Sequence, residues 1–161
     1  MDSRAEFEAG LDPERLRAGF AYWCSLLEKG EDVPRFSRFE PSAIPRLLSN
    51  IILLEVREAP LDFRYRVIGQ DVVDNLFANY TGQWLSDIPH QAEPGPLIDS
   101  LGAAVRERRP IHSSAPYIGP KRGYKAKHEI VLPLCDDDGR ISRLLIFLEF
   151  TLKAGYRRPV F

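Results

Sequence analysis

The chain has 161 residues, the usual size of one domain, and 44% of them are hydrophobic while 28% are charged. This composition is typical of a folded globule and excludes an intrinsically disordered protein. The formal net charge of −1 at pH 7 creates no overall field that would attract nucleic acid or an anionic membrane, so we expect neither as a partner.

The first residues and the cysteines favour a cytoplasmic localisation. Residues 1–6 are acidic and polar, unlike a signal peptide, and the longest apolar runs, 51–54 and 144–148, are too short to span a membrane. Cys24 and Cys135 lie far apart and form no CxxC pair, so no disulfide framework is predicted.

An amphipathic helix is predicted over residues 12–30, after a flexible segment at 1–11. Asp12 is a good N-cap, Pro13 suits the first helical position, and Gly30 ends the helix. One apolar stripe recurs with helical spacing. It consists of Leu16, Phe20, Trp23 and Leu27. We expect this stripe to be the helix interface, either with the same chain or across a homodimer.

Residues 31–152 are predicted to form one α+β domain, followed by a tail at 153–161. After an extended linker and a helical turn or two at 41–48, the segment 50–58 contains a stretch, 51–56, that is apolar at nearly every position, and 63–68 alternate. This pattern indicates a strand buried on both faces, paired with a strand buried on one face.

A helical crossover and three more strands complete the predicted domain. Helical segments are expected at 70–78, 84–88 and 97–109, with a proline-rich break before the last. Strands are expected at 111–118, 126–134 and 141–152, and the run Asp136-Asp137-Asp138-Gly139 is expected to be a tight turn.

The apolar content of the strands predicts their order in the sheet. The strands at 51–56 and 144–150 are apolar on both faces, so we place them side by side at the centre of one antiparallel sheet. The predicted order of the five strands is 2-1-5-4-3. Because the crossover covers one face only, the N-terminal helix is the natural cover for the other face.

Several short motifs share this framework with a known family. They are Trp23, PR at 34–35, IPRLL at 44–48, DFRYRVIG at 62–69, YTG at 80–82 and EIVLPL at 129–134. With these motifs the chain resembles PAS domains, and in particular a bacterial, mainly alphaproteobacterial, PAS-like family. The resemblance covers most of the chain, from about Trp23 to Leu152.

The resemblance implies a stand-alone sensory domain without chemistry of its own. Such domains hold a small ligand or cofactor, or a packed core, between the concave side of the sheet and the crossover. They often form dimers through a preceding helix. Because no output domain follows, signalling to a partner protein in trans is implied, and neither the ligand nor a cofactor can be named.

Eleven side chains are the candidate lining of such a pocket, although each is also a plausible core residue. They are Tyr65, Leu76, Phe77, Trp84, Leu85, Ile98, Leu101, Tyr117, His128, Ile130 and Phe147. His128 shares a strand face with Ile130, so it would reach a ligand only if that face points into the pocket. A hydrogen-bonded core histidine is the competing interpretation.

Other possible sites favour structural interpretations. Arg64 and Arg66 fit a solvated strand face better than an anion site. The three histidines have no metal-ligand spacing, the Asp-rich turn lacks a calcium-loop pattern, and the crossover lacks the cysteine of flavin photosensors. The basic loop at 121–127 fits a solvated hairpin loop, and no catalytic or phosphate-binding motif is present.

Two alternatives to a sensor remain open from the sequence. One is a small cone-shaped α+β enzyme of the ketosteroid-isomerase or dehydratase type, in which His128 would pair with Tyr65 or Tyr117. A hairpin before the helical crossover argues against it. The other is a purely structural dimerisation domain with a filled core.

Overall fold

The computed structural model describes residues 4, 7, 10, 14–92, 94–117, 119–121 and 123–154. The predicted N-cap Asp12, Pro13 and the segments 1–3 and 155–161 lie outside these residues. The helices are α2 (Glu14–Ser25), α3 (Gln70–Val73), α4 (Pro89–Ala92) and α5 (Pro96–Glu107), with short 3-10 turns η1 (Phe36–Arg38), η2 (Pro41–Ala43), η3 (Leu48–Asn50) and η4 (Leu85–Asp87). The strands are β1 (Ile51–Arg57), β2 (Asp62–Ile68), β3 (Ile111–Pro116), β4 (Tyr124–Cys135) and β5 (Ile141–Leu152).

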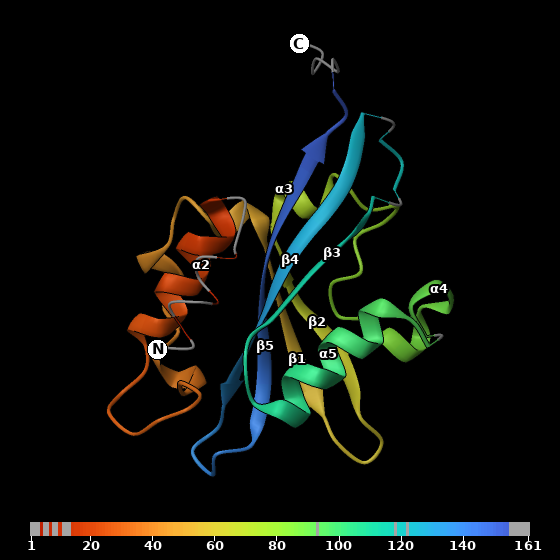
Figure 1. Cartoon of the computed structure of the whole chain (residues 1–161). Coiled ribbons are helices and arrows are strands. Elements are labelled where there is room, and N and C mark those ends of the chain that lie inside the picture. The colour runs from red at the N-terminus through yellow and green to blue at the C-terminus, as the bar shows by residue number, and fades with distance from the viewer. Residues whose placement is uncertain are drawn as a thin grey trace.

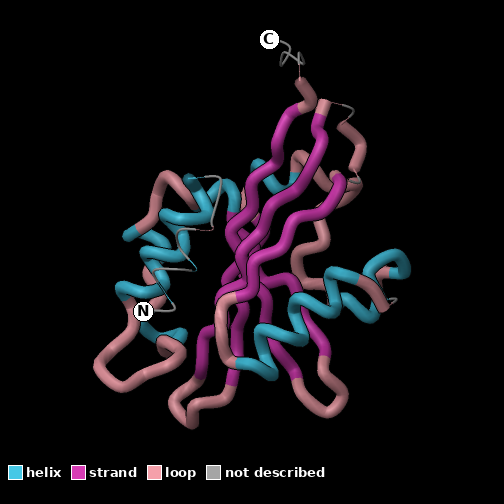
Figure 2. Tube along the Cα trace, in the orientation of Figure 1, coloured by secondary structure: helices cyan, strands magenta, loops and turns pink. Residues whose placement is uncertain are grey.

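The five strands form one antiparallel sheet in the order β2-β1-β5-β4-β3, which confirms the predicted order. Strands β1 and β5 lie at the centre, because their side chains are apolar on both faces and need cover on each. Figure 2 shows the strands as one twisted layer between two groups of helices. The fold is therefore α+β with a core on each side of the sheet.

Successive side chains of the central strands point alternately into these two cores. Leu54 and Ile146 pack with the crossover α3–α5, whereas Leu53 and Leu145 pack with α2. Figure 1 shows α2 against one face and α4 and α5 against the other. The sheet thus separates two layers, and each side chain of β4 or β5 faces only one of them.

Helix α2 packs on the sheet of its own chain. Leu16, Phe20 and Trp23 are buried there, with no more than 2% of each residue exposed, and Leu27 packs at the edge of the same core. A Cβ on Gly19 would lie only 2.5 Å from the ring of Phe147, so glycine permits this close approach. While α2 stays in this position, its apolar stripe is not available to a second copy.

Two predicted helices are shorter than expected. Helix α2 ends at Ser25, before the end of the predicted 12–30 segment, and the carbonyl of Leu26 then accepts a hydrogen bond from Arg38 Nη1 at 2.9 Å. Helix α3 ends at Val73 within the predicted 70–78 segment. There the side chain of Asn75 donates to the carbonyl of Asp71, a local bond that competes with regular helix.

The C-terminal end of α5 is fixed by Arg108. This residue has a left-handed backbone (φ 52°) directly after the helix. Its guanidinium donates to both carboxylate oxygens of Asp32, at 3.0 and 3.1 Å, and to the carbonyl of Gly139 at 2.6 Å. Arg108 therefore ties the crossover to the linker after α2 and to the β4–β5 turn, and it holds the pKa of Asp32 below its usual range.

A second ion pair in this linker gives a testable titration. Arg38 donates to both oxygens of Glu31, at 2.6 and 2.9 Å, and together with the backbone N–H of Glu28 it lowers the pKa of Glu31 from 4.5 to about 2. The stabilisation is thus fully present above pH 4.5 and is lost as the pH falls towards 2. We expect an NMR titration of Glu31 to show this low midpoint. In Arg38→Gln the midpoint should move towards 4.5, and an unchanged midpoint would contradict the assignment.

Candidate functional site

A cavity and an adjoining cleft lie between the sheet and the crossover. The cavity has a volume of about 70 Å³ and the cleft about 380 Å³. They share five lining residues, namely Leu76, Gln91, Leu97, Lys127 and Phe150. Because the cleft opens to solvent beside the cavity, the two form one candidate site with an inner and an outer part.

The inner wall is mainly apolar and comes from both layers. Strands β1 and β5 and helix α3 supply Ile52, Leu54, Val72, Ile146 and Leu148. These side chains belong to the core on the crossover side of the sheet. The inner part is therefore suited to an apolar group.

Tyr65 and Gln91 place a polar pair at the edge of this wall. The hydroxyl of Tyr65 donates to Gln91 Oε1 at 2.7 Å. Burial raises the pKa of Tyr65 well above its usual range, so the phenol stays protonated and keeps donating. This bond connects β2 to the helix α4, and the amide nitrogen of Gln91 has no partner among the residues that the structure describes.

A buried carboxylate and an amine complete the polar part of the wall. Glu129 on β4 is 5% exposed, and it accepts from Ser113 Oγ at 3.1 Å. Its other oxygen lies 3.4 Å from Nζ of Lys127, two residues away on the same strand face. The opposite charges of Lys127 and Glu129 compensate each other, because a buried charged group needs a partner of opposite charge in an apolar setting.

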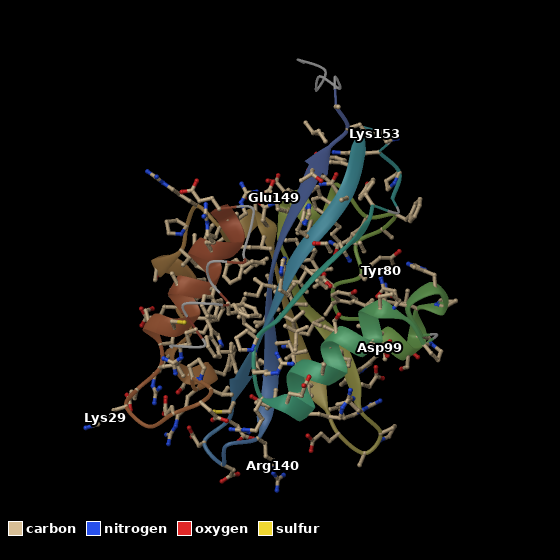
Figure 3. All side chains as sticks on the ribbon, in the orientation of Figure 1. Lys29, Tyr80, Asp99, Arg140, Glu149 and Lys153 are labelled. Atoms are coloured by element: carbon tan, nitrogen blue, oxygen red, sulfur yellow. The ribbon has the colours of Figure 1, made fainter. Side chains whose placement is uncertain are left out.

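Aromatic side chains border the outer part. Tyr80 lies on the crossover side of the sheet, opposite Glu149 on the side of α2 (Figure 3). Its hydroxyl is 3.3 Å from Nε2 of His90, a residue of the cleft. Tyr117 lines the cleft as well, and its hydroxyl donates to the carbonyl of Asn75 at 2.9 Å. The Tyr80–His90 contact lies within the crossover, whereas the Tyr117 bond joins the crossover to the residue that follows β3.

The structure brings together three of the predicted pocket residues. Tyr65 and Leu76 line the cavity, and Leu76 and Tyr117 line the cleft. Three others pack in the same core without lining either space. These three are Leu85, Ile98 and Leu101.

Three residues that were predicted to line the pocket lie instead on the opposite face of the sheet, so that prediction was wrong for them. Ile130 and Phe147 pack in the core beneath α2. His128 shares their face, where its ring nitrogens lie 2.8 Å from Ser114 Oγ and 3.4 Å from Thr151 Oγ1. Strand alternation is the reason, because the cavity takes the neighbouring residues Lys127 and Glu129.

Two more residues predicted to line the pocket lie outside it, one of them exposed to solvent and the other at the edge of the sheet. Phe77 is 66% exposed and lies outside the cavity. Trp84 lies beside the edge strand β2, where the guanidinium carbons of Arg57 and Arg64 stand 4.2 and 5.2 Å from its ring centroid. Both residues follow the end of a short helix or turn, where helical spacing no longer tells which way a side chain points.

The sequence interpretation missed Gln91, Lys127 and Glu129. A signal was present, because residues 130, 132 and 134 form the more apolar face of β4 and suit the aromatic stripe of α2. The other face of β4, which carries Lys127 and Glu129, would then have to face the crossover. Gln91 carried no comparable signal, because helix α4 lies in the segment interpreted as a proline-rich break.

The Arg64 and Arg66 side chains are directed to a carboxylate of the protein itself. Arg64 donates to Glu55 Oε2 from Nε at 3.1 Å and from Nη2 at 2.7 Å, and Arg66 lies 3.8 Å from the same oxygen. The bonds from Arg64 hold the pKa of Glu55 below its usual range. This agrees with the interpretation of a solvated strand face.

A larger hollow lies elsewhere, between α2 and residues 43–47. It measures about 850 Å³ and is widely open. The charged pair Arg15–Glu149 at its border is already satisfied internally. The smaller site, where an apolar wall and polar groups converge, is therefore the better functional candidate.

The residues that the structure describes offer neither a metal-ligand cluster nor a membrane-spanning helix. Among them, no three His, Cys, Asp or Glu side chains gather closely enough to hold a metal ion. None of their helices combines the length and apolar character needed to cross a membrane.

Comparison with protein-family models gives one match that covers most of the chain. The model of a family described as PAS domain matches residues 11–148. Among solved structures, the chain is similar to a sensory box sensor histidine kinase from Vibrio cholerae, with 18% sequence identity and a TM-score of 0.49, over 73% of this chain and 94% of that chain. No curated protein matches the chain.

Proposed function

The chain belongs to the PAS domain family, a family of sensory and non-catalytic domains, and from this we propose that it binds a small molecule beneath the crossover and reports its presence to a partner protein. The observation that supports the proposal most is the site itself. An apolar cavity ends in four polar side chains, Tyr65, Gln91, Lys127 and Glu129, and opens through a cleft to solvent. A domain with a filled core has no need of such a combination.

The enzyme alternative is weakened by the placement of His128. In that alternative, His128 would act as a base beside Tyr65 or Tyr117. The two tyrosines face the crossover, whereas His128 faces the side of α2, so the sheet separates the base from either acid. No pair suited to general acid–base catalysis remains from that prediction.

The output of the domain is part of the proposal. A homodimer through the N-terminal helix and a signalling partner in trans both remain predictions. If the dimer forms with α2 on its own sheet, its contact must use the outward side of the helix, which carries Glu14, Arg17, Ala18, Ala21 and Ser25.

Two tryptophan substitutions on β3 test whether the site binds a ligand. Ala115 lines the cleft, whereas its neighbour Ser114 faces the opposite side of the strand. We expect purified wild-type protein and Ser114→Trp to carry a non-covalent small molecule, seen as added mass in native mass spectrometry and released on denaturation. Ala115→Trp should lose that mass, because the indole occupies the cleft.

The control variant makes the result interpretable, since it adds the same side chain to the same strand. Equal added mass in both variants would place the ligand elsewhere. The bare polypeptide mass in all three proteins would contradict ligand binding and favour the structural dimerisation domain.

A further inference from the structure

We propose that the ligand of this site is an uncharged molecule, with an apolar chain or ring for the inner cavity and a carbonyl oxygen that accepts hydrogen bonds from Lys127 and Gln91. This inference rests on the proposed function and specifies its ligand. It follows from the charge balance of the site, from its unused donors and from the shape of its apolar wall.

The charge balance argues against ionic ligands. Among the described residues that line the inner cavity, Lys127 and Glu129 are the only charged ones, and their opposite charges compensate each other at 3.4 Å. A carboxylate ligand would put two negative groups around one amine. An ammonium ligand would put two positive groups around one carboxylate. Either leaves a surplus charge in a largely apolar space, which is costly.

The unused hydrogen-bonding groups favour an acceptor on the ligand. Lys127 Nζ has one partner in the described residues, Glu129, and so keeps protons to donate. Gln91 uses its oxygen for Tyr65, and its amide nitrogen has no partner among these residues. Two donors therefore flank the apolar wall, and a neutral carbonyl oxygen satisfies both without disturbing the Lys127–Glu129 pair.

The rest of the ligand is set by the apolar wall. Beyond the polar edge, the cavity is bounded by Leu54, Val72, Ile146 and Leu148, which offer no hydrogen-bonding group. An alkyl chain or small ring fits this surface. Amides, ketones, esters and lactones of modest size all meet the description.

Three probes with one chain and different head groups test the inference. Hexanamide is neutral, hexanoate is an anion and hexylammonium is a cation at pH 7. We expect calorimetry or ligand-observed NMR to show that hexanamide binds the wild-type protein at least about tenfold more tightly than either ion. Ala115→Trp should abolish this binding, and Ser114→Trp should retain it.

Two isosteric substitutions should change the preference in opposite directions. Glu129→Gln leaves Lys127 uncompensated, so hexanoate should gain about tenfold in affinity. Lys127→Met leaves Glu129 uncompensated, so hexylammonium should gain by a similar factor. Circular dichroism checks that both variants keep the wild-type fold, and the direction of each change is a readout that a merely destabilised protein would not give.

The outcomes separate this inference from the proposed function. Binding of hexanoate or hexylammonium to the wild type as tightly as hexanamide overturns the neutral-ligand inference and leaves ligand binding in place. Failure of all three probes also overturns it. The proposed function is tested separately, and it falls if native mass spectrometry shows no added mass.

Discussion

Replacing Trp23 by alanine is expected to lower the free energy of unfolding by about 3–5 kcal/mol, the largest loss we predict for a single side chain. Trp23 is 2% exposed, and its ring stacks on Phe20 with centroids 6.1 Å apart. Its Nε1 donates to the carbonyl of Pro133 at 2.8 Å. The substitution therefore opens a cavity beneath α2 and leaves a buried carbonyl without its donor.

The other tryptophan of the chain provides the control. Trp84 lies partly exposed beside β2 and contacts the guanidinium groups of Arg57 and Arg64. We expect Trp84→Ala to cost about 1 kcal/mol, the scale of a surface cation–π contact and its packing. Urea unfolding followed by circular dichroism measures both losses. Equal losses would contradict the position of α2 on its own sheet.

The same variants bear on the dimer prediction. Because Trp23 is buried within its own chain, Trp23→Ala should change stability without removing a contact between copies. Light scattering below the unfolding transition should give the same molecular mass for wild type and variant. A loss of mass in the folded variant would indicate that the stripe of α2 contacts a second copy after all.

The second large effect is expected at a backbone contact. A Cβ on Gly69 would lie 2.4 Å from the carbonyl oxygen of Leu48 and 2.5 Å from the carbonyl carbon of Ser49. Both are main-chain atoms, and the Gly69 N–H donates to Ile51 at 2.8 Å, so neither segment can move aside freely. We expect Gly69→Ala to lower the free energy of unfolding by about 3 kcal/mol.

Gly102→Ala is the matched control for this substitution. The three atoms nearest to its Cβ would belong to the end of the Arg106 side chain, the closest at 2.6 Å, and that exposed group can rotate away. Because Gly102 lies inside helix α5, alanine should instead raise the free energy of unfolding by about 0.5–1 kcal/mol. If both variants shift the urea midpoint in the same direction, the contact at Gly69 is not what limits the substitution.

The strand order could be predicted because it depends on apolar pattern alone. Residues 51–54 and 144–148 are apolar at every position, and only a central place in the sheet buries both faces. Gly69 shows the limit of this reasoning. The sequence marks it as the end of a strand, but the approach of residues 48 and 49 depends on a tertiary contact that no local pattern records.

The site was harder to predict than the sheet. Alternation along β4 groups Lys127 with Glu129, and His128 with Ile130, but it does not say which group faces the crossover. That choice is made by α2, whose aromatic stripe packs on Ile130 and Leu132. Tyr65 packs in the core on the crossover side, and its role in lining a ligand pocket stays a prediction.

Arg108 gives the domain a mechanical link between its two sides. Helix α5 starts beside Leu97, at the cavity, and ends at Arg108, whose bonds to Asp32 grip the chain that leads out of α2. If a ligand displaces the first turn of α5, the whole helix changes its position relative to the sheet. Arg108, at the other end of the helix, then either moves together with Asp32 or loses its hydrogen bonds to Asp32. Arg108 therefore connects the helix that borders the cavity to the segment that follows α2, around the end of the sheet.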